Sequence, residues 1–111
     1  MIEQTIIEYL QPLIPVPVST QKREEHPDSY VIVERTGGGM ENHIRSAMIA
    51  IQAYGPTQVD AARLHEELID LMLSIISLDD IGACDLNAEY NYTDESTKEY
   101  RYQSVWDIVY Y

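Results

Sequence analysis

The chain has 111 residues, the size of one domain, and a formal net charge of -12 at pH 7. This charge argues against a free-standing DNA-binding domain and against binding to anionic membranes, because both depend on clusters of Lys and Arg. We expect no membrane span and no secretory signal, and the single cysteine, Cys84, excludes an intrachain disulfide.

The first half of the chain predicts a helix followed by three strands. Apolar residues recur every three or four positions from Ile2, until Pro12 ends the helix near Leu10 or Gln11. Alternating prolines and then β-branched and aromatic residues mark the strands. The expected strands are a short edge strand over residues 16–22 and two longer ones over residues 30–35 and 43–54.

A run of three glycines separates the two longer strands. Gly37, Gly38 and Gly39 are followed by Met40 and Glu41. Because consecutive glycines gain no side-chain packing and lose the most entropy on ordering, we expect a flexible tip of a long β-hairpin. A phosphate-binding loop is disfavoured, since the Lys and the Ser or Thr that would follow the last glycine are missing. The five residues are candidate contacts to a neighbouring subunit, on which such a tip can become ordered.

The second half predicts a long helix followed by a hairpin. Thr57 and Asp60 resemble a capping box, and apolar residues continue at helical spacing to about Ser77. The C-terminal half of this helix is apolar on more than one face, so we expect it to be deeply buried. Alternating residues then predict strands over residues 86–92 and 100–110, joined by a polar loop.

These elements predict a single α+β domain over residues 1–111. Its expected order is helix, three strands, helix, two strands. Hairpin-connected strands favour a mostly antiparallel sheet of about five strands, with both helices packed on one face.

Tyrosine is the most unusual residue type in the sequence. There are nine Tyr and no Phe, and most of the Tyr lie in the closing hairpin. Tyrosine is enriched at protein interfaces, because its ring is apolar and its hydroxyl can remain hydrated. The candidate contact residues of this hairpin are Tyr100, Tyr102, Tyr110 and Tyr111. The alternative is that they form the core face of the sheet, and both can hold because a sheet has two faces.

The possible catalytic groups match no recognised motif. Ile69 stands where a zinc peptidase would need a second histidine after His65. Adjacent carboxylates point apart on helices and strands, and a lone cysteine is usually a small buried hydrophobe. The adjacent carboxylates are Glu24 with Glu25, Glu66 with Glu67 and Asp79 with Asp80. We therefore expect a protein that is not an enzyme, with no metal site and no cofactor.

Five segments occur in an order and spacing that resemble a known family. They are Pro15–Thr20, Tyr30–Gly39, Ala50–Tyr54, the long acidic helix, and Tyr102–Asp107 in the tyrosine-rich closing hairpin. Together they cover nearly the whole chain and resemble the small tail-terminator, or tail-completion, proteins of long-tailed bacteriophages and prophages. The resemblance implies a ring, commonly a hexamer, that caps the tail tube, ends its polymerisation and contacts the head-side connector while DNA passes through the centre.

The resemblance also implies a place in the virion. We expect the protein at the head–tail junction, in the cytoplasm of the bacterial host during assembly, and not at a membrane. An acidic balance suits a channel that DNA crosses without being held, because phosphate is repelled. Residues 57–111 hold twelve acidic and three basic side chains, so they carry most of this charge.

Three other functions remain open from the sequence. Another connector or joining protein of the phage neck would have a similar size and element order. A small acidic adaptor or inhibitor would bind a basic partner through carboxylates spaced along one face. A metal-dependent enzyme would use acidic side chains, and binding of a divalent cation would then stabilise the fold.

Overall fold

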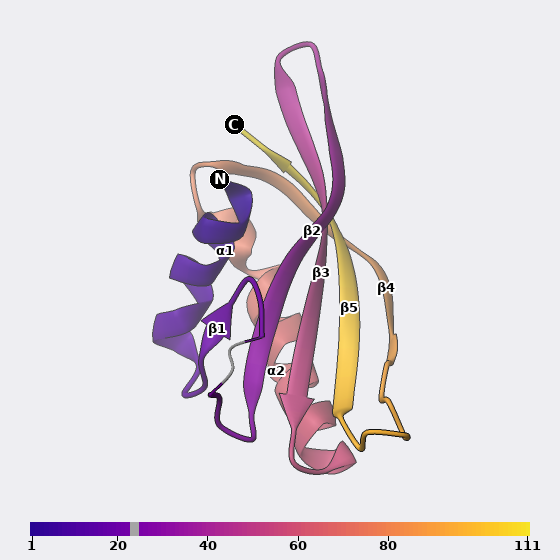
Figure 1. Cartoon of the computed structure of the whole chain (residues 1–111). Helices are drawn as coiled ribbons and strands as arrows, with labels where there is room; N and C mark the ends of the chain where they lie inside the picture. The colour runs from indigo at the N-terminus through magenta and orange to yellow at the C-terminus, as the bar shows by residue number, and fades with distance from the viewer. Residues whose placement is uncertain (23–24) are drawn as a thin grey trace.

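The computed structural model, which describes residues 1–22 and 25–111, contains one five-stranded sheet with two α-helices on one face (Figure 1). The helices are α1 (Ile2–Leu10) and α2 (Gln58–Leu73), followed by the 3-10 turns η1 (Gln11–Leu13) and η2 (Ile75–Ser77). The strands are β1 (Val18–Ser19), β2 (Tyr30–Glu41), β3 (Ile44–Gly55), β4 (Ile81–Asn91) and β5 (Tyr100–Tyr110). The expected α+β class and element order are confirmed. Glu24 of the expected carboxylate pairs lies outside the described residues.

The strands lie in the order β1-β2-β3-β5-β4. All neighbours are antiparallel except β1, which pairs in parallel with β2 through Val18 and Val31. The expected edge strand is therefore present, but it is only two residues long. The ladder between β4 and β5 is interrupted twice, between Ile81 and Ala83 and between Leu86 and Ala88.

The core lies between the sheet and the two helices. Alternate side chains of each strand point toward the helices, because successive residues of a strand face opposite sides of a sheet. Fully buried core residues are Ile6 and Leu10 of α1, Val31 and Val33 of β2, Ile49 and Ile51 of β3, Leu68 and Met72 of α2, and Trp106 and Ile108 of β5.

The other face of the sheet carries no helix, and we call it the open face. The cross-strand pairing and the strand alternation place its residues. They are Tyr30, Ile32, Glu34, Gly37, Gly39 and Glu41 of β2, Ile44, Ser46, Met48, Ala50, Gln52 and Tyr54 of β3, Ala83, Asp85, Ala88 and Tyr90 of β4, and Arg101, Gln103, Val105, Asp107 and Val109 of β5.

Helix α2 begins with the cap that its sequence predicts. The backbone N–H of Asp60 donates to the Thr57 hydroxyl oxygen at 3.2 Å, and that hydroxyl donates to the Asp60 carboxylate at 2.8 Å. The far end differs from expectation. Met72 and Ile75 are fully buried, but Leu73 and Ile76 are each 57% exposed, because only one side of this end faces the sheet.

The expected flexible glycine tip is wrong. Strand β2 continues through the glycines to Glu41, because each of them pairs with β3 in a regular antiparallel ladder. The turn consists only of Asn42 and His43, with φ of 51° and 66°. Two successive residues with positive φ form the type I′ turn that is favoured in two-residue hairpins.

Two other boundaries differ from the sequence prediction. Helix α2 ends at Leu73 rather than near Ser77, and the 3-10 turn η2 covers Ile75–Ser77. Strand β4 begins at Ile81 rather than at Leu86, because its first residues pair with the end of β5, with Ile81 opposite Tyr110. No helix among the described residues has the length and apolar character needed to cross a membrane.

Candidate interaction surfaces

The tip of the β2–β3 hairpin projects beyond the rest of the molecule (Figure 1), and below its turn β3 stays paired with β5 from Arg45, opposite Tyr110, onward. We call this part, Glu34–Glu41 with Ile44–Met48, the arm. Apolar side chains are exposed on it: Met40 is 59% exposed, Ile44 44% and Met48 39%. Because exposed apolar side chains grouped on a projecting element are typical of contact sites, the arm favours contact with another surface.

The three glycines of the arm differ in what the fold requires of them. None has a positive φ, so backbone conformation does not require glycine at any of them. A Cβ atom on Gly38 would lie 2.6 Å from the backbone carbonyl oxygen of Ser46, a clash that explains this glycine. A Cβ on Gly37 would meet nothing within 4 Å, and one on Gly39 only the Ser46 hydroxyl at 3.8 Å. The register of β2 against β3 shifts between Arg35 and Gly37, and glycine often marks such a bulge, so only Gly39 has no explanation within the domain.

The open face carries a groove at the base of the arm. The groove has a volume of about 280 Å³, and its lining includes Gly37, Met48, Asp85, Asp107 and Val109. On the opposite side of the arm, a cleft of about 410 Å³ is lined by residues that include Arg35, Arg45, Met1, Asp80 and Tyr110. The groove thus contains two aspartates, whereas the cleft on the other side of the arm contains two arginines together with Glu3 and Asp80.

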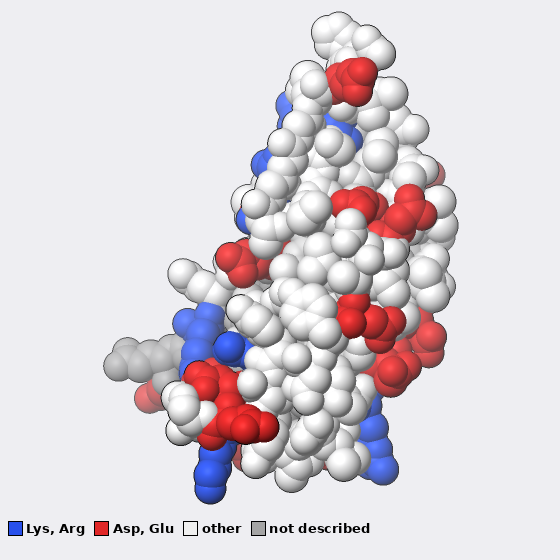
Figure 2. Space-filling model, turned by 90° about the vertical axis from the view of Figure 1, so that its right-hand side faces the viewer, with Lys and Arg blue, Asp and Glu red and all other residues white. Residues whose placement is uncertain are grey.

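Several of the charged side chains around the arm have no ion-pair partner among the described residues. Asp85 and Asp107 lie directly opposite each other on β4 and β5, and both are exposed. Within the described part of the chain, neither forms an ion pair, and neither do Arg35 and Arg45. Asp107 accepts a hydrogen bond from the Asn87 amide at 2.8 Å. Figure 2 shows acidic side chains scattered over one side of the molecule, with Lys and Arg at its margins.

An aromatic and amide cluster occupies the opposite end of the open face. The rings of Tyr30 and Tyr54 stack with centroids 4.4 Å apart, and the Arg101 guanidinium lies over Tyr54. The Tyr54 hydroxyl donates to Gln52 at 2.9 Å, and the Gln52 amide donates to Gln103 at 2.8 Å. Tyr30 and Tyr54 are only 5% and 7% exposed, so with Ile32 they form a small second core on this face and not an open surface.

The candidate tyrosines of the closing hairpin do not share one surface. Tyr102 lies on the helix side, with its ring 5.3 Å from that of His65, and Tyr110 packs against the core. Tyr100 is half-buried at the start of β5, and Tyr111 is 73% exposed after its end. The sequence analysis missed the cluster around Tyr54. The signal that could have found it is the alternation of Tyr30 and Tyr54 with core residues of their strands.

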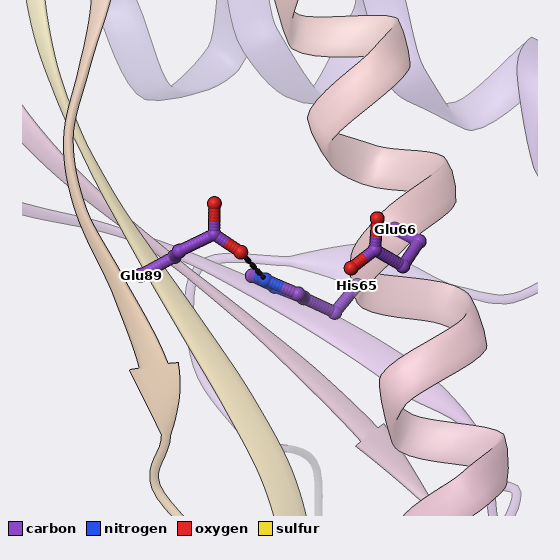
Figure 3. Close-up of side chains that lie close together, drawn as sticks. All are labelled: His65, Glu66 and Glu89. Carbon is purple, nitrogen blue, oxygen red and sulfur yellow. Dashed lines mark hydrogen bonds and ion pairs between the residues drawn. The ribbon is translucent and has the colours of Figure 1, made fainter.

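One group of side chains could hold a metal ion. The donor atoms of His65, Glu66 and Glu89 all lie within 4.8 Å of one another (Figure 3). His65 is buried, and its Nε2 lies 3.0 Å from a carboxylate oxygen of Glu89, whereas both carboxylates are exposed. The histidine is thus already hydrogen-bonded, and a metal would have to replace this contact. No sequence motif predicts the group, since Glu89 comes from β4 and the other two residues from α2.

Cys84 has the environment of an unreactive thiol. Burial, with a smaller contribution from the neighbouring Asp85, raises its pKa to about 11. The thiolate is the nucleophilic form, so little of it exists at neutral pH. The sequence expectation that Cys84 behaves as a small hydrophobe agrees with this environment.

Labelling of Cys84 with iodoacetamide at pH 8 is expected to be about a hundredfold slower in the folded protein than in urea. Because the pKa of the thiol in the folded protein is about 11, the thiolate fraction increases about tenfold per pH unit below that value. The labelling rate of the folded protein should rise by the same factor until about pH 11. Because the pKa of Cys84 is higher in the folded state, its protonated thiol contributes to the free energy of unfolding. This contribution is present in full below pH 9 and is lost progressively as the pH rises toward 11. Mass spectrometry of quenched samples measures the rates. Equal rates in both states would contradict the burial of the thiol.

Comparisons of the sequence with models of known families and with curated proteins found no match. The features available for inferring a function are therefore the arm, the unpaired charges on its two sides and the uncovered open face.

Proposed function

We propose that the protein is a structural subunit of the neck of a long-tailed bacteriophage or prophage. Its copies assemble as a ring that caps the tail tube, ends its polymerisation and joins the tail to the head. The observation that carries the proposal is the arm, whose exposed apolar side chains Met40, Ile44 and Met48 are not covered by their own domain. Such a surface is typical of a contact with another protein.

The charge of the chain supports the same function. A net charge of -12 disfavours tight binding of DNA, which a channel for genome passage must avoid. The partners under this proposal are further copies of the chain, hexameric by the resemblance, with the tail tube protein on one side and the head-side connector on the other. The protein acts at the head–tail junction after assembly in the cytoplasm of the host.

The state of assembly tests the proposal. Light scattering and native mass spectrometry at rising concentration are expected to show a ring-sized species, which negative-stain microscopy should image as a ring. The double variant Met40→Ser with Ile44→Ser removes apolar side chains from the arm. It is expected to raise the concentration needed for assembly by at least about tenfold, because apolar burial drives such contacts.

A matched control uses apolar residues that are equally exposed on α2. Val59 is 59% exposed and Leu73 57%, close to the exposure of Met40. Val59→Ser with Leu73→Ser should leave assembly unchanged. A strictly monomeric wild-type chain at the highest concentration would contradict the proposal, and so would equal effects of the two double variants.

A second candidate function is an acidic adaptor that binds a basic protein. The unpaired Asp85 and Asp107 favour it, since two like charges opposite each other in a sheet are unfavourable without a cation nearby. It predicts a monomer whose binding to a basic partner weakens steeply with salt. The assembly measurement described above separates the two candidates.

A further inference from the structure

The two sides of the arm carry opposite charge. Strand alternation places Arg35, Met40 and Arg45 on the side that faces the helices, where Arg45 lies opposite Tyr110. The other side belongs to the open face, and its groove is lined by Asp85 and Asp107. One side is thus basic and apolar, and the other is acidic.

None of these four charges forms an ion pair within the described residues, although Asp107 accepts a hydrogen bond from Asn87 and Arg35 donates one to the Gly37 carbonyl. The described residues place no carboxylate at ion-pair distance from either arginine, although Glu3 and Asp80 line the same cleft. They also place no Lys or Arg at that distance from Asp85 or Asp107. The pairing of two aspartates across β4 and β5 costs stability, because like charges directly opposite in a sheet repel. A cation from outside the domain would remove this cost.

The glycines indicate that another surface approaches the groove closely. Gly37 and Gly39 lie inside a strand, where glycine is less stable than alanine. Neither φ nor steric crowding within the domain requires glycine there. Glycine in a strand often marks a bulge, such as the register shift beside Gly37, or a place where another backbone comes near, which is the explanation left for Gly39. A side chain on Gly37 or Gly39 would project from the open face beside the groove and hold a docking surface away.

We infer that the basic side of the arm of one copy docks in the acidic, glycine-floored groove of the next copy. In this contact Arg35 and Arg45 approach Asp85 and Asp107, and Met40 covers Gly37 and Gly39. The occupant is a second copy because the complementary surface is present on the same chain, on the other side of the same arm. This inference rests on the proposed ring and identifies its subunit contact.

The arrangement has a defined symmetry. Each copy offers two different surfaces, so the contact is heterologous and passes from copy to copy in one direction. A heterologous contact closes into a ring when its rotation is an integral fraction of a full turn. A two-fold contact in which the basic side of the arm meets itself would place arginine against arginine and would be repelled.

Charge reversal tests the contact. We expect Arg35→Glu with Arg45→Glu, and separately Asp85→Lys with Asp107→Lys, to raise the concentration required for assembly by at least about tenfold each, because like charges then meet. Control reversals of a single charge on the exposed side of α2 are Arg63→Glu and Asp70→Lys. Neither control is expected to change assembly.

Mixing the two double variants gives a sharper result. A reversed arm fits a reversed groove, and the native arm of the second variant fits the native groove of the first. The mixture is therefore expected to assemble with the two chains alternating, which closes only in rings with an even number of copies. Native mass spectrometry distinguishes the chains by their masses and counts them. Failure of the mixture to recover assembly would overturn the inference.

The glycines provide a readout that does not depend on charge. Gly37→Ala with Gly39→Ala is expected to leave the melting temperature of the monomer unchanged or raised, because both methyl groups have space. The same variant should weaken assembly at least about tenfold. If wild type and all variants form the same ring, the contact lies elsewhere and only this inference fails. If wild type forms no ring, the proposed function fails as well.

Discussion

Replacement of Trp106 by alanine is expected to lower the free energy of unfolding by about 3–5 kcal/mol. The indole is fully buried in the main core, opposite Ile49 of β3 and Leu86 of β4. Its Nε1–H donates to the Ser104 hydroxyl at 2.8 Å, so the one polar group of the indole is paired in the wild type. Since domains of this size have a total stability of about 5–15 kcal/mol, the loss is a large fraction of it.

Urea unfolding followed by far-UV circular dichroism measures this loss. Tryptophan fluorescence is unsuitable, because Trp106 is the only tryptophan in the chain. Tyr111→Ala serves as the control, since this aromatic side chain is 73% exposed and should change the free energy of unfolding little. A loss below about 1 kcal/mol for Trp106→Ala would show that the indole does not fill the core.

Replacement of Gly55 by valine is expected to destabilise the domain by about 1–3 kcal/mol or more. A Cβ at this position would lie 2.6 Å from the backbone nitrogen of Ala61 and 3.0 Å from the backbone carbon of Asp60. Both atoms belong to the first turns of α2. Backbone cannot rotate away as a flexible side chain can, so the helix would have to move off the end of β3.

Gly37→Val is the matched control for Gly55→Val. Both glycines lie in strands and have no positive φ, but a Cβ on Gly37 meets nothing within 4 Å. Valine at position 37 should therefore leave stability unchanged or raise it slightly, because valine favours strands. The midpoint of urea unfolding compares the variants. Equal losses for Gly37→Val and Gly55→Val would mean that glycine flexibility, and not the contact with α2, determines the effect.

The helices were predictable because their signals are local. Periodic apolar residues identify α1 and α2, and Thr57 with Asp60 marks the start of α2 within one turn. Pro12 similarly shows where α1 ends. Alternation and turn residues also gave the order of the strands, and with it the class of the fold.

The course of β2 through the glycines could not be predicted from local preferences. Glycine alone favours a loop, whereas pairing of Gly37–Glu41 with β3 supplies the backbone hydrogen bonds that keep the segment extended. The face of the sheet on which each strand residue lies was even harder to predict from the sequence. Tyr54 and Tyr102 are both strand tyrosines, yet they lie on opposite faces of the sheet. The face of each residue depends on register, which a one-residue shift would invert.

Strand β4 has a consequence for how copies of this chain can associate. It is an outer strand of the sheet, and a long unprotected outer strand can recruit identical chains into amyloid-like fibres. The two interruptions of its ladder and the exposed charges of Asp85 and Glu89 oppose such recruitment. Identical chains are therefore disfavoured from pairing edge to edge through β4. Association through the faces of the sheet remains favourable, and such contacts can produce a particle of fixed size.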